Sequence, residues 1–180
     1  MTPRTSHTHP LRIDSLKWNG SGRIGMTFCP GKCDPHAMTG AWARDLSVDL
    51  QAMRDWGAGT LVTLMEEHEL ESLAVSALGE AARARGLDWI HLPIRDVSIP
   101  DHRFVQRWPA IRQELAARLE MGQSVVVHCR GGLGRTGLVV GLLLVEAGVP
   151  PYEALNAVRG ARPGALETRE QERYLLDTPS

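Results

Sequence analysis

The segment from Ser124 to Glu146 constrains the fold of this chain more than any other part. An uninterrupted apolar run, SVVVH, leads directly into the glycine-rich stretch CRGGLGRTG, which is followed by a second apolar run, LVVGLLLV. A short apolar run without alternation is typical of a strand that is buried on both faces, as strands of parallel sheets are. We therefore expect a strand over 124–128, a tight loop, and a buried helix over 136–147.

Other parts of the sequence repeat this alternation of strand and helix patterns. Further strands are predicted over 23–28, 60–65 and 88–94, and further helices over 39–55, 70–85, 103–121, 151–159 and 166–176. Alternating strands and helices are typical of an α/β domain, in which helices flank a central and mainly parallel sheet. Ligands of such sheets bind beyond the carboxyl ends of the strands, where the glycine-rich loop is expected to lie.

Length and composition favour one globular domain. The chain has 180 residues, of which 43% are hydrophobic and 23% charged. Residues 1–22 are polar and are predicted to form a flexible N-terminal tail, which leaves residues 23–180 as a single domain. The formal net charge of −1 gives no reason to expect nucleic acid or a membrane as a partner. Three cysteines, no secretory leader and no apolar run of bilayer length indicate a cytoplasmic protein.

The glycine-rich stretch has the features of a phosphate-binding loop. Its glycines let backbone N–H groups converge on one point without obstruction by side chains, and the N-terminus of the following helix adds positive potential there. Arg135 is suited to hold two oxygens of a bound dianion through its planar fork. The predicted phosphate-binding residues are Arg130, Gly131, Gly132, Leu133, Gly134 and Arg135.

Two exchanges distinguish this loop from the nucleotide-binding pattern G-x-x-x-x-G-K-[ST]. Cys129 stands where that pattern has its first glycine, and Arg135 stands where it has lysine. A thiol beside a helix N-terminus and an arginine is expected to be largely thiolate at neutral pH, and is then a nucleophile directed at phosphorus. Thr136 is predicted to donate its hydroxyl to that sulfur, and His128 to orient the loop by hydrogen bonding.

The stretch HCRGGLGRTG resembles the signature HC-x5-R-[ST] of the cysteine-dependent protein phosphatases. The stretches FCPGK, HLPIRDVSIPD and GALETREQERYL extend the resemblance over residues 22–176, and are most similar to the dual-specificity subgroup around the cyclin-dependent kinase-associated phosphatase. The resemblance implies a protein-tyrosine-phosphatase-like fold and no requirement for a metal or cofactor. It also implies that phosphotyrosine, phosphoserine or phosphothreonine of a protein or peptide is hydrolysed through a phosphocysteine intermediate.

The resemblance further implies an aspartate on a mobile loop, upstream of the cysteine, that acts as the general acid. Asp96 follows a predicted strand directly, so we expect it to fill this role. Asp101 is the alternative, although it is also well placed to cap the next helix. Gln171 matches a glutamine that positions the hydrolytic water in classical tyrosine phosphatases. Glu167 replaces the other glutamine, and its role stays open.

Two further cysteines lie near the start of the predicted domain. Cys29 and Cys33, in CPGKC, are expected to flank a turn, because no second pair of ligands completes a metal site. A sharper hypothesis is that one of them forms a reversible disulfide with Cys129. Two other classes of function stay open: a phosphate-binding module without turnover, and a thiol enzyme that handles sulfur or arsenate.

Overall fold

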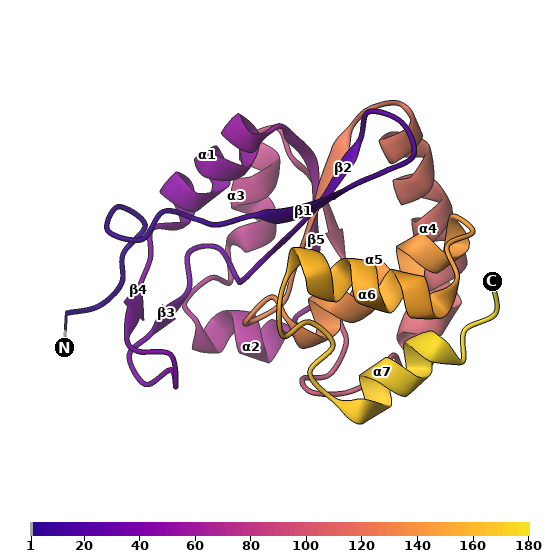
Figure 1. Ribbon diagram of the computed structural model, residues 1–180. Coiled ribbons are helices and arrows are strands. Elements are labelled where there is room, and N and C mark those ends of the chain that lie inside the picture. The colour runs from indigo at the N-terminus through magenta and orange to yellow at the C-terminus, as the bar shows by residue number, and fades with distance from the viewer. Residues whose placement is uncertain (1) are drawn as a thin grey trace.

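A single sheet at the centre of the molecule brings the two halves of the chain together. The computed structural model describes residues 2–180. The five strands have the order β1-β2-β7-β5-β6, in which β1 is antiparallel to β2 and all other neighbours are parallel (Figure 1). Their bounds, in that order, are β1 (Asp14–Lys17), β2 (Arg23–Thr27), β7 (Ser124–His128), β5 (Ala58–Thr63) and β6 (Asp88–His91).

Helices cover both faces of this sheet. One face carries α1 (Leu46–Trp56) and α3 (Leu78–Ala84), which contact β5 and β6. The other face carries four helices (Figure 1), namely α4 (His102–Glu120), α5 (Gly134–Glu146), α6 (Pro151–Ala161) and α7 (Arg169–Leu176). The predicted class, a mainly parallel sheet flanked by helices, is confirmed.

The strand β7 and the helix α5 form the centre of the core, because their sequences are apolar on all sides. Every residue of β7 is buried, and so are the residues of α5 from Gly134 to Val145. Full burial of one valine or leucine side chain contributes about 1.5–3 kcal/mol, so this unit firmly holds the loop between its two elements. Even α5 falls short of a membrane span, and no other helix within residues 2–180 is long and apolar enough to be one.

The register of the parallel strands places several loops at one edge of the sheet. Thr27 at the end of β2 and Thr63 at the end of β5 both pair with His128, the last residue of β7. The segments that follow these strands therefore leave the sheet side by side. One of them leads into α2 (Glu67–Ser72), and another is the glycine-rich loop.

The helix predicted over 39–55 is shorter in the structure. It begins at Leu46, because the side chain of Asp45 caps it by accepting a hydrogen bond from the N–H of Val48 at 3.0 Å. The residues before the cap contribute instead to a short antiparallel ribbon, formed by β3 (Cys33–Asp34) and β4 (Trp42–Ala43).

The helix predicted over 70–85 is divided into α2 and α3. Between them, Ala74 adopts a left-handed backbone conformation with φ of 58°, which no helix can continue through. The carbonyl of Leu73, at the end of α2, accepts a hydrogen bond from the N–H of Cys33 in the ribbon. A contact with a distant segment thus ends a helix that the local pattern would have continued.

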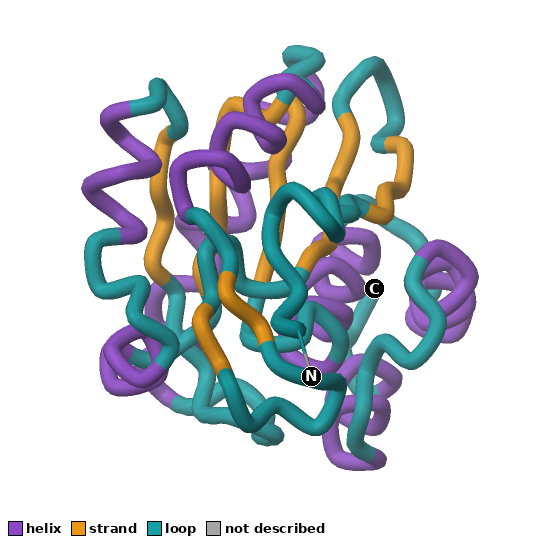
Figure 2. Tube along the Cα trace, turned by 90° about the vertical axis from the view of Figure 1, so that its left-hand side faces the viewer, coloured by secondary structure: helices purple, strands orange, loops and turns teal. Residues whose placement is uncertain are grey.

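The segment predicted as a flexible tail over 1–22 is attached to the rest of the molecule. Met1 lies outside the described residues. Residues 14–17 form the edge strand β1. The backbone of Arg4 exchanges hydrogen bonds with Ala41 and Ala43, so the chain near its N-terminus lies beside the β3–β4 ribbon (Figure 2). The sequence-based expectation of a loose tail is wrong here, because backbone groups of this segment find partners far along the chain.

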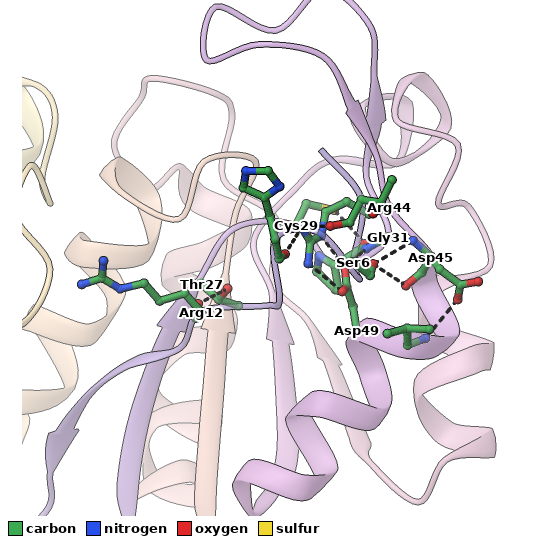
Figure 3. Close-up of polar contacts among 12 residues, drawn as sticks. Ser6, Arg12, Thr27, Cys29, Gly31, Arg44, Asp45 and Asp49 are labelled. Atoms are coloured by element: carbon green, nitrogen blue, oxygen red, sulfur yellow. Dashed lines mark hydrogen bonds and ion pairs between the residues drawn. The ribbon is translucent and has the colours of Figure 1, made fainter. Parts of the chain in front are cut away.

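A buried arginine fastens the same segment to α1. Arg44 donates two hydrogen bonds of 2.8 Å to the carboxylate of Asp49, and a third of 2.8 Å to the carbonyl of His9 (Figure 3). Ser6, which is also buried, accepts a hydrogen bond from the N–H of Asp45 at 2.9 Å. Most of this segment stays exposed or half-exposed, as its polar composition suggests, but Ser6 and several of its backbone groups find internal partners.

Candidate active site

The glycine-rich loop packs closely against the end of β2. Gly132 has a φ of 70°, and a Cβ there would lie 2.2 Å from the carbonyl oxygen of Thr27, so both its conformation and its surroundings require glycine. The N–H of Cys29, just beyond β2, donates to the carbonyl of Arg130 at 3.2 Å. These contacts set the position of the loop relative to the sheet.

A side chain from the end of α6 orients two peptide groups of the loop. Arg162 donates to the carbonyl oxygens of Gly132 at 2.5 Å and Gly131 at 3.1 Å, and to the carboxylate of Asp14 at 2.8 Å. In a trans peptide the N–H points opposite to the C=O. Because both carbonyls point toward Arg162, the N–H groups of Gly132 and Leu133 point the other way, as an anion cradle requires.

A buried ion pair fixes the guanidinium of Arg135. The carboxylate of Glu69, in α2, accepts two hydrogen bonds from it, at 2.8 and 2.9 Å. The carbonyl of Ile94 accepts a third at 3.0 Å, and the carboxylate of Asp96 lies 2.9 Å from Nη2. Although burial opposes ionisation of Glu69, its hydrogen bonds with Arg135 and the arginine's charge hold the pKa of that carboxyl below its usual range.

The histidine at the end of β7 is held as a neutral ring. Trp89 donates to the hydroxyl of Thr63 at 2.8 Å, and that hydroxyl lies 2.7 Å from Nε2 of His128. Nδ1 lies 3.2 Å from the carbonyl of Cys129, which can only accept, so Nδ1 carries the proton and Nε2 accepts from Thr63. Complete burial lowers the pKa of His128 to about 4. The ring thereby connects the first peptide of the loop to β5.

The two candidate general acids have different environments. Asp96 lines the same cleft as Cys129, and its side chain is 53% exposed while pairing with Arg135. Asp101 caps α4 by accepting hydrogen bonds from the N–H groups of Arg103 and Phe104, at 3.0 and 3.2 Å. Asp101 does not line that cleft. The structure therefore brings Asp96, and not Asp101, together with the loop.

Three other predicted residues surround the start of α5. The hydroxyl of Thr136 is buried without a hydrogen-bond partner among residues 2–180, so it makes no bond to the sulfur of Cys129. Gln171 is buried as part of the cap of α7, and its side chain donates to the carbonyl of Ser98 at 3.2 Å. A Cβ on Gly134 would lie 2.5 Å from a carboxylate oxygen of Glu167 and 2.9 Å from the amide oxygen of Gln171.

The loop forms the floor of a cleft of about 570 Å³. Cys129 is only 3% exposed at its base. A depression of about 690 Å³ between α1 and α3 is larger but contains no residue of the loop, so we do not assign the chemistry to it. The β2–β3 connection and the β3–β4 ribbon contribute one wall of the cleft, through Phe28, Lys32, Asp34, His36, Ala37, Met38, Thr39 and Trp42.

Sequence patterns missed Glu69, Arg162 and Thr63. Only Glu69 carries a local signal, because Glu66 and Glu69 form a capping box at the start of α2, yet that signal concerns the helix and not the arginine. The other two residues become relevant only through contacts between distant segments. Within residues 2–180 no group of three or more histidine, cysteine, aspartate or glutamate side chains is arranged to hold a metal ion.

All three cysteines are free thiols. Cys29 is buried, and burial raises the pKa of its thiol. Cys33 is half-buried, with its sulfur close to the carbonyls of Gly31 and Arg44. The hypothesis that one of them forms a disulfide with Cys129 stays a prediction.

Comparison with known proteins agrees with this geometry. Residues 38–149 match the family described as "Tc-R-P: Polymorphic toxin system, DSP-PTPase phosphatase". The chain is similar to cyclin-dependent kinase inhibitor 3 of Mus musculus, with 31% identity over 163 residues, covering 89% of this chain and 76% of that protein. The same protein of Rattus norvegicus is 30% identical over 179 residues, covering 96% and 81%.

Solved structures give the same result. The crystal structure of kinase associated phosphatase, with its catalytic site cysteine replaced by serine, has a TM-score of 0.81 at 27% identity and covers 92% of each chain. The active form of Tk-PTP has a TM-score of 0.64 at 28% identity, covering 91% of this chain and 96% of that one. The resemblance drawn from the loop is confirmed, and the chain belongs to the dual-specificity and protein tyrosine phosphatases, which are cysteine-based enzymes.

Proposed function

We propose that this protein hydrolyses phosphomonoesters on phosphorylated proteins or peptides through a phosphocysteine intermediate on Cys129. The observation that carries the proposal is the convergence on one cleft of Cys129, the fixed guanidinium of Arg135 and the carboxylate of Asp96. A nucleophile, a charge clamp and a proton donor are the groups that this reaction requires.

In the first step, the thiolate of Cys129 attacks phosphorus in line with the leaving oxygen, and a P–S bond forms as the P–O bond breaks. The N–H groups of Gly132 and Leu133, directed inward by Arg162, bind the equatorial oxygens together with Arg135. Asp96 gives its proton to the departing alkoxide or phenoxide, so the product leaves as an alcohol or phenol.

In the second step, water attacks the phosphocysteine and Asp96 takes up a proton from it. The P–S bond breaks, and the sulfur leaves as a thiolate. Thr136 has a buried hydroxyl with no partner in the described chain, so it is available to donate to the charge that develops on sulfur. Gln171 is assigned only a supporting role, since its amide is engaged by Thr168 and Ser98.

A phosphorylated protein or peptide is the proposed substrate class, because the cleft is open and has Met38 and Val97, both strongly exposed, on its walls. The loop residues Arg130, Gly131 and Leu133 lack the paired lysines of lipid-phosphate specialists, which disfavours phosphoinositides. Because Cys129 must remain a reduced thiolate to act, the activity fits a reducing compartment such as the cytoplasm.

The decisive experiment compares hydrolysis of p-nitrophenyl phosphate by the wild type, Cys129→Ser and Cys33→Ser in the presence of a metal chelator. We expect activity in the wild type, its loss by about 10⁴-fold or more in Cys129→Ser, and its retention in Cys33→Ser, which lies outside the cleft. A phosphate-binding module would bind phosphate but show no turnover in any variant. A thiol enzyme for sulfur or arsenate would turn over thiosulfate or arsenate and leave the ester intact.

A further inference from the structure

One lysine in the cleft is held in place by aromatic rings. Lys32 precedes β3 and is only 7% exposed. Its Nζ lies 4.5 Å from the ring centroid of Phe28 and 4.4 Å from that of Trp42, which places the cation over both ring faces. All three side chains line the cleft whose floor holds Cys129.

Lys32 differs from the other cations around the cleft because it has no anionic partner. Within residues 2–180, its Nζ takes part in no hydrogen bond or ion pair. By contrast, Arg130 pairs with Asp34 at 2.9 Å, and Arg135 pairs with Glu69 and Asp96.

The two rings do not by themselves explain why Lys32 lacks a carboxylate partner, because a second cation over the same rings has one. Arg44 lies 4.9 Å from the centroid of Phe28 and 5.7 Å from that of Trp42, and its charge is matched by Asp49. The chain supplies a carboxylate to this arginine and leaves the lysine beside the cleft unmatched.

Burial makes it unfavourable for Lys32 to be ionised, and the nearby charges do not compensate for this effect. Burial is the largest effect and lowers the pKa of Lys32 to about 8, while Cys29 and Asp34 raise that pKa and Arg44 and Arg130 lower it. At neutral pH the ammonium is therefore mostly charged, largely buried and without an ion-pair partner in the described chain. An anion that enters the cleft would relieve this imbalance.

The cleft also has room for more than one phosphorylated side chain. Its volume of about 570 Å³ lies within the range of sites that enclose a ligand of drug size, whereas the phosphoryl group itself occupies only the cradle at the floor. The wall that carries Lys32 thus faces space that neighbouring residues of a substrate would fill.

We propose that Lys32 is a specificity-determining residue that binds a second acidic group of the substrate, carried by a residue next to the phosphorylated one. This inference rests on the proposed phosphatase function. The group is an oxyanion, either the carboxylate of aspartate or glutamate or a second phosphoryl group, because both accept hydrogen bonds from an ammonium. Two other roles for Lys32 make different predictions: a purely structural cation between the rings, and a contact with the phosphoryl group that is transferred.

The test measures kcat/KM on three kinds of phosphopeptide that share one phosphorylated residue. Their neighbouring positions carry only neutral residues, one glutamate, or one phosphoserine, with the acidic residue placed one or two positions to either side. We expect the wild type to prefer at least one acidic peptide over the neutral one by about tenfold. The preference for glutamate against phosphoserine distinguishes the two sources of the oxyanion.

Two variants test whether Lys32 causes the preference for an acidic peptide. Lys32→Met keeps roughly the length of the side chain and removes its charge. In this variant, the ratio of kcat/KM on the preferred acidic peptide to kcat/KM on the neutral peptide falls to near one. In Lys32→Arg, which restores a cation, part of the ratio returns. Circular dichroism and thermal unfolding check that each variant is folded. Independently of any variant, the wild-type preference declines as the pH rises through about 8.

Each result has a definite meaning. A wild type that hydrolyses all peptides equally overturns the role of Lys32 and leaves the phosphatase proposal intact, whereas a wild type that hydrolyses no peptide and no p-nitrophenyl phosphate overturns the phosphatase proposal. A Lys32→Met variant that keeps both the wild-type ratio and the wild-type kcat/KM on each peptide shows a structural cation. A variant that loses kcat/KM equally on all peptides, with an unchanged ratio, shows contact with the transferred phosphoryl group. Either of these two results for Lys32→Met overturns the inference.

Discussion

The phosphate loop and the acid loop face each other across the cleft and differ in how they are held. In the phosphate loop, residues 129–135, Cys129 and Arg135 are 3% and 2% exposed. Arg162 and the N–H of Cys29 donate hydrogen bonds to carbonyl groups of the loop, and the carboxylate of Glu69 accepts one from Arg135. In the acid loop, residues 95–101, the side chain of Asp96 is 53% exposed.

The acid loop has fewer ties to the rest of the fold. Asp96 contacts the core through Arg135, and the carbonyl of Ser98 accepts a hydrogen bond from Gln171. Val97 has a φ of 50°, in a region that a β-branched residue rarely adopts, and is 60% exposed. A firmly held loop, the proposed anion site, therefore stands opposite the proposed proton donor on a weakly held loop.

This difference affects how substrate binds. The carboxylate of Asp96 contacts Nη2 of Arg135, one of the donors that we propose for the phosphoryl oxygens. In the proposed reaction the substrate replaces that contact, and we expect the loop with fewer ties to be the one that moves. We therefore expect the phosphate loop, as the rigid half of the site, to stabilise charge and the acid loop, as the mobile half, to transfer the proton.

The largest expected effect tests the rigid half. Arg135→Lys retains a positive charge but loses the planar fork, so kcat on p-nitrophenyl phosphate falls by about 10²–10³-fold. The matched control is Arg118→Lys, at the far end of the sheet beside Asp88, which leaves kcat unchanged. Equal losses in the two variants would show that the fork of Arg135 has no special role.

The next effect concerns stability beneath the phosphate loop. The lowered pKa of His128, about 4 against an ordinary 6.5, means that the unfolded chain takes up a proton before the folded one does. The free energy of unfolding is therefore highest above pH 6.5 and decreases as the pH falls toward about 4, by up to about 3 kcal/mol.

Denaturant unfolding of the wild type and His128→Gln measures this contribution. Between pH about 6.5 and about 4.5 the wild type loses stability more steeply than the variant. Glu69 adds its own loss as the pH falls through its ordinary value of 4.5, because its pKa is lowered in the folded state, so its contribution begins where that of His128 is nearly complete. Parallel curves for the two proteins would contradict the neutral, buried histidine.

A smaller effect separates the two acids of the mobile half. Asp96→Asn removes the proton donor and lowers kcat on an alkyl phosphate by about 10²-fold, with a smaller loss on p-nitrophenyl phosphate, whose leaving group needs no proton. Asp101→Ala removes the cap of α4 and costs about 1 kcal/mol of stability while kcat stays near that of the wild type. The reverse pattern would make Asp101 the acid.

The smallest expected effect tests the hydrogen bonds that Arg162 donates to carbonyl groups of the phosphate loop. Arg162→Met frees the carbonyls of Gly131 and Gly132, and the resulting misalignment of the cradle lowers kcat/KM by about tenfold. Arg159→Met is the matched control in the same helix, since Arg159 donates to Ala165 and Leu166 and not to the loop. If both variants behave alike, Arg162 stabilises α6 rather than the cradle.

The unit from Ser124 to Glu146 could be predicted because its signals are local. Continuous apolar residues specify the buried strand and helix, and Gly132 supplies the conformation that the loop needs. Burial then follows from composition alone. The position of the loop at the carboxyl edge of a parallel sheet follows from the alternation of elements. The choice of Asp96 as the acid rests on the resemblance, which implies an aspartate on this loop, and on its position directly after a predicted strand, and it stays a prediction.

Only the tertiary structure decided which distant groups meet the loop. Glu69 lies in a helix whose limits the local pattern misjudged, and Arg162 and Lys32 reach the site from opposite ends of the chain. Local periodicity reports which face of an element is apolar, but it does not report which buried charge will face which partner. That depends on strand order and register, which bring residues far apart in the sequence to one edge of the sheet.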